Sequence, residues 1–108
     1  MTIIPEITVD EIDPEFVLLD VREADEWAAG HAPAARHLAL SELAETDHGF
    51  APGDRVQVVC KVGGRSARAT AFLRDQGVDA VNVIGGMLAW AAAGLDVVTD
   101  DGSTGHVA

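Results

Sequence analysis

The stretch VQVVCKVGGRSAR, residues 56–68, joins a strand pattern to a helix pattern and decides the fold. Apolar, β-branched residues before Cys60 favour a buried strand, and the two glycines after it let the backbone turn tightly. A helix is predicted to begin near Ser66. We therefore expect Cys60 at the carboxyl end of a strand, close to backbone N–H groups and a helix amino end, which favour a thiolate over a thiol.

Basic residues are concentrated around this loop. The chain carries 18 acidic and 7 basic side chains, for a net charge of −11, yet residues 55–74 include five bases and no acid. Lys61 and Arg65 lie within the glycine loop itself and predict an anion site around Cys60. The arginines further along fit equally well on the exposed face of the following helix.

Length and composition restrict the class of protein. A chain of 108 residues can form one core, and its acidic balance argues against binding to nucleic acid or to anionic membranes. No basic leader or long apolar run is visible, and one cysteine cannot form an internal disulfide. These features predict a protein of the reducing cytoplasm. The four histidines lack metal-ligand spacing, so we expect neither a metal nor a cofactor.

The rest of the chain alternates short apolar strands with helices. Strands are expected over residues 16–21, 36–39, 56–60 and 80–84, and helices over 24–29, 66–76 and 87–93. A capping box from Thr8 to Glu11 predicts a short first helix, and Ser41 is expected to cap another. This alternation is typical of an α/β layer with a mostly parallel sheet, whose chemistry lies at the carboxyl ends of the strands. The loops after Val21 and Ile84 should then reach the same edge as Cys60.

Several polar and aromatic residues are given structural roles. Asp20 and Arg22 are expected to tie the loop after their strand to the sheet. Trp27 and Trp90 are predicted to anchor the core, and Gly30 to end a helix as a C′ glycine. His31 is interpreted as a loop or cap residue, and Ser66 as an N-cap rather than a nucleophile, because no base is evident beside it.

Four segments together resemble the rhodanese homology domain: LLDVRE (18–23), GHAPAA (30–35), CKVGGR (60–65) and GGMLAW (85–90). They occur in that family's order and roughly its spacing, over about residues 6–97. The resemblance implies a single-domain rhodanese-like fold, in which helices flank both faces of a mainly parallel five-stranded sheet. Residues 98–108 are interpreted as an acidic, glycine-containing, flexible tail.

The resemblance also implies a sulfurtransferase in which Cys60 carries sulfane sulfur as a persulfide. A small anionic donor such as thiosulfate would deliver the sulfur, and an external thiol, cyanide or a protein would accept it. Lys61 and Arg65 would neutralise the donor. The persulfide would be stabilised by the N–H groups of Val62, Gly63, Gly64 and Arg65.

Two other functions remain open at this stage. A small phosphatase-like or arsenate-reducing enzyme of the related branch has one more residue between cysteine and arginine than the four found here. A non-catalytic module that binds a partner protein, or relays sulfur for one, would share the whole pattern. Thiosulfate users of the family often carry arginine just after the cysteine, where this chain has Lys61. The reaction class is therefore better supported than the donor.

Overall fold

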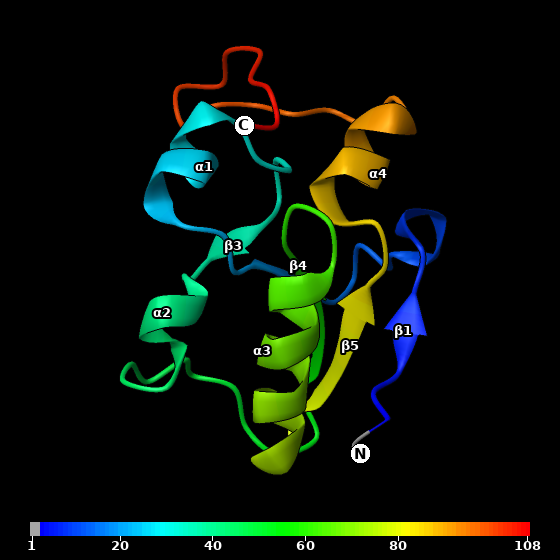
Figure 1. Ribbon diagram of the computed structural model, residues 1–108, viewed down its shortest axis with the longest axis vertical. Coiled ribbons are helices and arrows are strands. Elements are labelled where there is room, and N and C mark those ends of the chain that lie inside the picture. The colour runs from blue at the N-terminus through cyan, green and yellow to red at the C-terminus, as the bar shows by residue number, and fades with distance from the viewer. Residues whose placement is uncertain (1–2) are drawn as a thin grey trace.

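Five parallel strands form one sheet in the computed structural model, which describes residues 3–108 (Figure 1). The strand order is β1-β5-β4-β2-β3, and every neighbouring pair runs parallel. The elements along the chain are β1 (Glu6–Ile7), the 3₁₀ helix η1 (Val9–Glu11), β2 (Val17–Asp20), α1 (Ala24–Ala29), β3 (Arg36–His37), α2 (Leu40–Leu43), β4 (Arg55–Val59), α3 (Gly64–Asp75), β5 (Asp79–Val83) and α4 (Gly86–Ala92). The predicted α/β fold with a five-stranded sheet is confirmed.

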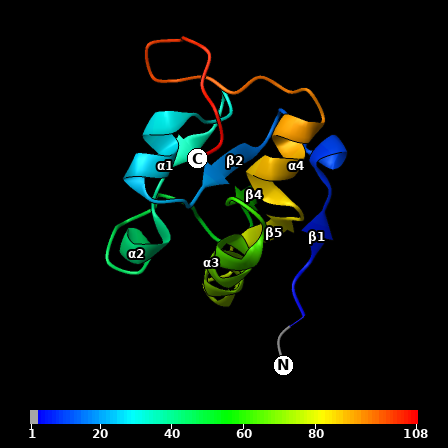
Figure 2. The ribbon, with the colours of Figure 1, turned by 45° about the horizontal axis from the view of Figure 1, so that its top comes forward.

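Two apolar clusters cover the two faces of the sheet. Val56 and Val58 of β4 pack with Leu73 of α3 on one face. On the other face Val59 packs with Met87 of α4, because successive side chains of a strand point to opposite sides. Figure 2 shows α3 and α4 on the two sides of the sheet. Burial on both faces explains why the central strands read as nearly continuous apolar runs.

Gln57 is the polar exception inside β4, and its amide has a defined structural task. The side chain is 2% exposed. Its Oε1 accepts from the backbone N–H of Asp13 at 2.7 Å, and its Nε2 donates to the Asp13 carbonyl at 2.9 Å. The Gln57 amide and the backbone N–H and carbonyl of Asp13 therefore all have hydrogen-bond partners. These bonds offset the free-energy cost of burying the Gln57 amide.

Asp20 and Arg22 form an ion pair that is completely buried. The Arg22 Nη2 lies 2.7 Å from the Asp20 Oδ2, and neither side chain is exposed. The same Nη2 donates to the carbonyl of Gly30 at 2.8 Å, which joins the end of α1 to the end of β2. The predicted role of this pair, tying the loop to the sheet, is confirmed.

Two of the predicted helix caps differ from the structure. Helix α1 does end at Gly30, as predicted, but Gly30 has φ 163° and ψ 144°, an extended conformation rather than that of a C′ glycine. Glycine is needed there for space, because a Cβ would lie 2.6 Å from the backbone of His106. Ser41 lies inside α2, whose N-cap is Ala39, and its hydroxyl donates to the Glu23 carboxylate instead.

The two tryptophans have different surroundings. Trp90 packs against the apolar cluster beneath α4, as expected. Trp27 lies outside both clusters, so its predicted role as a core anchor is wrong. Its ring stacks on His31 at a centroid distance of 3.6 Å and on His37 at 4.9 Å. His31 is a buried loop residue, and its Nε2 lies 2.9 Å from the Asp100 carboxylate.

The carboxyl-terminal segment folds back over the loop after α1. Val98 forms an antiparallel bridge with His31, with N···O distances of 2.8 and 2.9 Å. The N–H of His106 donates to the carbonyl of Ala29 at 3.0 Å. Figure 1 shows this segment passing above α1. The acidic composition of the tail gave no sign of this pairing, and its flexibility stays a prediction.

The helices are short. The longest, α3, has 12 residues, and none within residues 3–108 is both long and apolar enough to cross a membrane. The cytoplasmic location stays a prediction.

Candidate active site

Cys60 directly follows β4 and lies at the carboxyl edge of the sheet, as predicted. The residue is only 1% exposed and belongs to the apolar cluster beneath α3. The segments after β2 and β5 reach the same edge, where Glu26 contacts Arg65 and Gly86 contacts the backbone of Cys60. The residue is therefore almost inaccessible to solvent, and three parallel strands deliver the residues around it.

Hydrogen-bond donors surround the Cys60 sulfur. The backbone N–H of Gly63 donates to Sγ at 3.1 Å, and the Ser66 hydroxyl lies 3.3 Å from it. Burial acts to raise the pKa of the thiol. The Ser66 hydroxyl and the backbone N–H groups of Ser66, Gly63 and Val62 act in the opposite direction and outweigh burial. The pKa of Cys60 is therefore lowered, and its thiolate is more accessible than that of an ordinary cysteine.

The backbone of this loop differs slightly from the prediction. Gly63, with φ 119°, is the N-cap of α3, and Gly64 is its first residue. Ser66 is therefore inside the first turn of the helix, so its predicted role as N-cap is wrong. The backbone N–H groups that act on the sulfur are those of Gly63, at 3.1 Å, and of Val62 and Ser66, whereas the sequence predicted those of Val62, Gly63, Gly64 and Arg65.

Ser66 connects the sulfur to a second polar network. Its hydroxyl lies 2.6 Å from the Asn82 Oδ1, and a hydroxyl has one proton, so Asn82 and the sulfur compete for it. The Asn82 Nδ2 donates to Glu6 at 2.9 Å and to the Gly63 carbonyl at 3.3 Å, which orients the amide oxygen toward Ser66. Asn82 thus links β5 and β1 to the thiol loop.

The turn after β5 supports the loop from the side. The N–H of Met87 donates to the Cys60 carbonyl at 2.8 Å, and the N–H of Leu88 donates to the Lys61 carbonyl at 3.1 Å. Gly86, the residue before Met87, has φ 56°, and a Cβ there would lie 2.4 Å from the Cys60 carbonyl oxygen. Only glycine allows so close an approach of the two backbones.

Arg65 is held by Glu26 of α1 in a two-pronged ion pair. The Nη1–Oε1 distance is 2.5 Å and the Nη2–Oε2 distance is 2.9 Å. Hydrogen bonding to Arg65 lowers the pKa of Glu26 to about 2, and the pairing raises the pKa of Arg65. The pair has no net charge at neutral pH, so Arg65 contributes less positive potential to the loop than its sequence position suggests.

The remaining residues of the loop differ in exposure. Lys61 is half-buried and forms no ion pair with any other residue of the described chain. Val62 is 60% exposed at the tip of the loop. Outside the loop, Arg55 and Arg74 both pair with Asp79, at 3.2 and 3.4 Å. Lys61 is therefore the loop cation without a carboxylate partner in the part of the chain that the structure describes.

Sequence reasoning missed Glu26, Asn82 and Glu6. Glu26 is 39 residues from Arg65, Asn82 is 16 from Ser66, and Glu6 is 76 from Asn82. Only the parallel packing of their strands brings them together. The sequence offered one weak indication, which is that Glu26 follows the end of β2 and Asn82 lies near the end of β5, at the edge of the sheet where Cys60 lies.

Comparisons with known proteins agree with this geometry. The family model described as "Rhodanese-like domain" matches residues 6–93. Over 80 residues the chain is 38% identical to the Bacillus subtilis protein named "Putative sulfurtransferase YtwF", covering 74% of this chain and 78% of that protein.

A second Bacillus subtilis protein, named "Putative sulfur carrier protein YrkF", is 32% identical over 94 residues, which cover 81% of this chain and 51% of that protein. This chain thus spans about half the length of YrkF. Among solved structures, a rhodanese-related protein from Thermoplasma volcanium is 30% identical and superposes with a TM-score of 0.81. That match covers 89% of this chain and 99% of the other.

Proposed function

The chain belongs to the rhodanese-like domain family, and we propose that it transfers sulfane sulfur from a small anionic donor such as thiosulfate through a persulfide on Cys60. The observation that carries the proposal is the Cys60 sulfur itself. It receives the Gly63 N–H at 3.1 Å at the amino end of a 12-residue helix, and its pKa is lowered. A thiolate is the form of cysteine that attacks sulfur.

In the first step the Cys60 thiolate attacks the outer sulfur of thiosulfate. A new S–S bond forms to Cys60, the S–S bond of the donor breaks, and sulfite leaves with the electron pair of that bond. The persulfide remains as an anion. The N–H groups that lower the pKa of the thiol, those of Ser66, Gly63 and Val62, are the groups nearest to stabilise that charge.

Lys61 and Arg65 are the cations proposed to meet the donor's sulfonate. Lys61 has no carboxylate partner within residues 3–108, whereas the charge of Arg65 is balanced by its ion pair with Glu26. We therefore assign Lys61 the larger part of donor binding. Arg65 mainly fixes the loop against α1 through its two bonds to Glu26.

In the second step an external nucleophile removes the outer sulfur and restores the thiolate. This chain has a single cysteine, so no disulfide within it can release the sulfur. The acceptor is a thiol, a protein or, in an assay, cyanide. Because Cys60 is 1% exposed, little room is left for a donor to reach its sulfur, which favours a small donor.

A sulfur relay is the second function that an observation favours. The relative YrkF is named as a sulfur carrier, and a covered sulfur is suited to hold a persulfide for a partner. A relay would load one sulfur per chain from thiosulfate without turning over with cyanide. The third function, a phosphatase-like or arsenate-reducing enzyme, requires hydrolysis of an aryl phosphate or reduction of arsenate that depends on Cys60.

Intact-mass measurement after incubation with thiosulfate tests the proposal. We expect the wild-type chain to gain one sulfur atom, which cyanide then removes with release of thiocyanate, and we expect Cys60→Ala to gain none. Lys61→Ala is expected to raise the KM for thiosulfate and to leave the unfolding midpoint nearly unchanged. No gain of sulfur in wild type, or an equal gain in Cys60→Ala, would contradict the proposal.

A further inference from the structure

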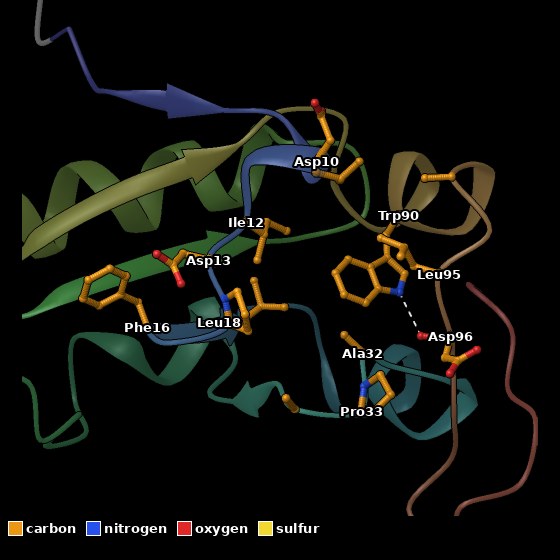
Figure 3. Close-up of a pocket in the computed structure, with 14 residues that line it drawn as sticks. Asp10, Ile12, Asp13, Phe16, Leu18, Ala32, Pro33, Trp90, Leu95 and Asp96 are labelled. Atoms are coloured by element: carbon orange, nitrogen blue, oxygen red, sulfur yellow. Dashed lines mark hydrogen bonds between the residues drawn. The ribbon is translucent and has the colours of Figure 1, made fainter.

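An apolar groove of about 700 Å³ lies on the face of the sheet that carries η1 and α4 (Figure 3). Apolar side chains form most of its lining, and three carboxylates join them. The lining includes Ile12, Leu18 and Trp90, together with Asp10, Asp13 and Asp96. None of the residues from Cys60 to Ser66 belongs to the lining, so this groove is separate from the thiol site.

The floor of the groove is aromatic and held in place. Figure 3 shows the Trp90 ring beside Ile12 and Leu18. The Trp90 Nε1 donates to the carbonyl of Asp96 at 2.8 Å, which fixes both the ring and the chain after α4. Leu95 and Phe16 are 40% and 46% exposed, so large apolar surface remains uncovered. Such a surface binds apolar groups by removing them from water.

The rim of the groove is acidic. Asp10, Asp13 and Asp96 stand at its margin, and no lysine, arginine or histidine of the described chain lines it (Figure 3). The backbone of Asp13 is clamped by Gln57, at 2.7 and 2.9 Å. The Thr8 hydroxyl donates to the Asp10 carboxylate at 2.5 Å. Three carboxylates thus stand around an apolar floor, and the chain that carries Asp13 and Asp96 is held by the bonds to Gln57 and Trp90.

Helix α4 connects this groove to the thiol loop. Its first residue, Gly86, lies against the Cys60 carbonyl. The groove is lined by Trp90, in the last turn of α4, and by Ala93, the residue after the helix. Seven residues of α-helix span about 10 Å. A protein seated in the groove would therefore cover α4 and extend to the edge where the persulfide is formed.

We propose that the groove docks a cationic, apolar segment of the protein that exchanges sulfur with Cys60. The exchange rests on the proposed function, whereas the docking itself rests on the groove. Charge complementarity selects this occupant, because lysine or arginine beside a large apolar side chain satisfies both the acidic rim and the aromatic floor. A second copy of this chain, with net charge −11, would be repelled.

Two capped tetrapeptides test the docking on the full chain. One reads arginine, leucine, leucine, arginine, and the other has glutamine in place of both arginines. Binding is followed by the NMR signals of the Trp90 indole N–H, Ala93 and Leu95. We expect the cationic peptide to shift these signals in a saturable manner and to bind on the order of tenfold more tightly than the glutamine peptide.

Matched variants locate the interaction. Asp10→Asn, Asp13→Asn and Asp96→Asn together keep the hydrogen-bond acceptors and remove three charges. We expect this variant to bind the cationic peptide roughly tenfold more weakly. Glu42→Gln, Glu45→Gln and Asp75→Asn together remove the same charge elsewhere and should leave binding unchanged. Leu95→Ala is expected to weaken both peptides.

Three outcomes would overturn the proposal: equal binding of the two peptides, an equal loss in the two charge variants, or self-association of the chain through the groove in sedimentation. Cys60→Ser should bind the cationic peptide as wild type does. Peptide binding without sulfur loading would refute the proposed function alone, and sulfur loading without peptide binding would refute the docking alone.

Discussion

The two turns that follow β4 and β5 use the same backbone device for different ends. Each begins one residue after its strand, with Cys60 in the first and Ile84 in the second, and each contains a left-handed glycine that caps a helix. Gly63 has φ 119° and Gly85 has φ 79°. Cys60 is 1% exposed beneath its loop, whereas Ile84 is 48% exposed.

The difference shows that the turn after β4 carries the reactive sulfur, whereas the turn after the neighbouring strand β5 holds the backbone of that turn in place. The first turn directs N–H groups and a hydroxyl at a sulfur atom. The second turn donates two backbone N–H groups to the carbonyls of Cys60 and Lys61, and so fixes the backbone of the first. The thiol loop is thus held from outside itself, by Gly86 on one side and by Glu26 on the other.

The largest effect is expected at the supporting turn. In Gly86→Ala the new Cβ would meet the carbonyl oxygens of Cys60 and Lys61 at 2.4 and 2.5 Å, at a residue with φ 56°. We expect a loss of about 3 kcal/mol or more in the free energy of unfolding, together with loss of sulfur loading. Urea denaturation and intact mass after thiosulfate measure the two effects. A fully stable, active Gly86→Ala would refute the supporting role of this turn.

Within the thiol loop, the two glycines should respond differently to the same substitution. Gly63→Ala strains a left-handed residue, with φ 119°, although the nearest atom to the new Cβ is 3.7 Å away. We expect a loss of about 1–3 kcal/mol. Gly64 is helical and a Cβ there meets nothing within 4 Å, so Gly64→Ala should gain roughly 0.5 kcal/mol. Equal unfolding free energies for the two variants would show that the turn does not require Gly63.

The contact between the loop and α1 should depend on pH. The pKa of Glu26 is about 2, below its ordinary 4.5, so its ion pair stabilises the fold above about pH 4.5 and is lost as pH falls toward 2. After screening by solvent, Glu26→Gln should lower the free energy of unfolding by about 1–2 kcal/mol at pH 7 and by little near pH 2. Glu42→Gln, an exposed control, should show no such dependence. A deficit in Glu26→Gln that persists unchanged at low pH would contradict the role of the ion pair.

The sequence allowed the elements and the edge of the sheet to be predicted, because those depend on local patterns. β-branched runs, the glycines and the alternation of strands and helices placed Cys60 at the carboxyl end of β4. Parallel topology then placed the turns after β2 and β5 beside it. The wholly parallel sheet agrees with that reasoning.

Contacts over long sequence separations could not be predicted in the same way. The Glu26–Arg65 pair depends on how α1 lies beside α3, and the Asn82–Ser66 contact depends on how β5 lies beside α3. Ser66 looked like a helix cap because it follows the glycines, but its hydroxyl turns to the sulfur and to Asn82 instead. Gly30 looked like a helix stop, and the reason for glycine there is the backbone of His106, 76 residues later.

The smallest change tests the thiol itself. In Ser66→Ala the hydroxyl that lowers the pKa of Cys60 is lost. The pKa should therefore rise, and the thiolate fraction at neutral pH should fall. The buried Asn82 Oδ1 also loses its donor, so the free energy of unfolding should fall by about 1 kcal/mol. Alkylation of the chain's one cysteine by iodoacetamide, followed by intact mass, reports the thiolate directly. A pKa unchanged from wild type would show that Ser66 does not act on the sulfur.

The same alkylation, measured in the wild-type chain as a function of pH, is the most direct test of a Cys60 thiol whose pKa is lowered at the edge of the sheet. We expect a half-maximal rate at a pH below about 8.5, the ordinary pKa of cysteine. A midpoint at or above that value would contradict it.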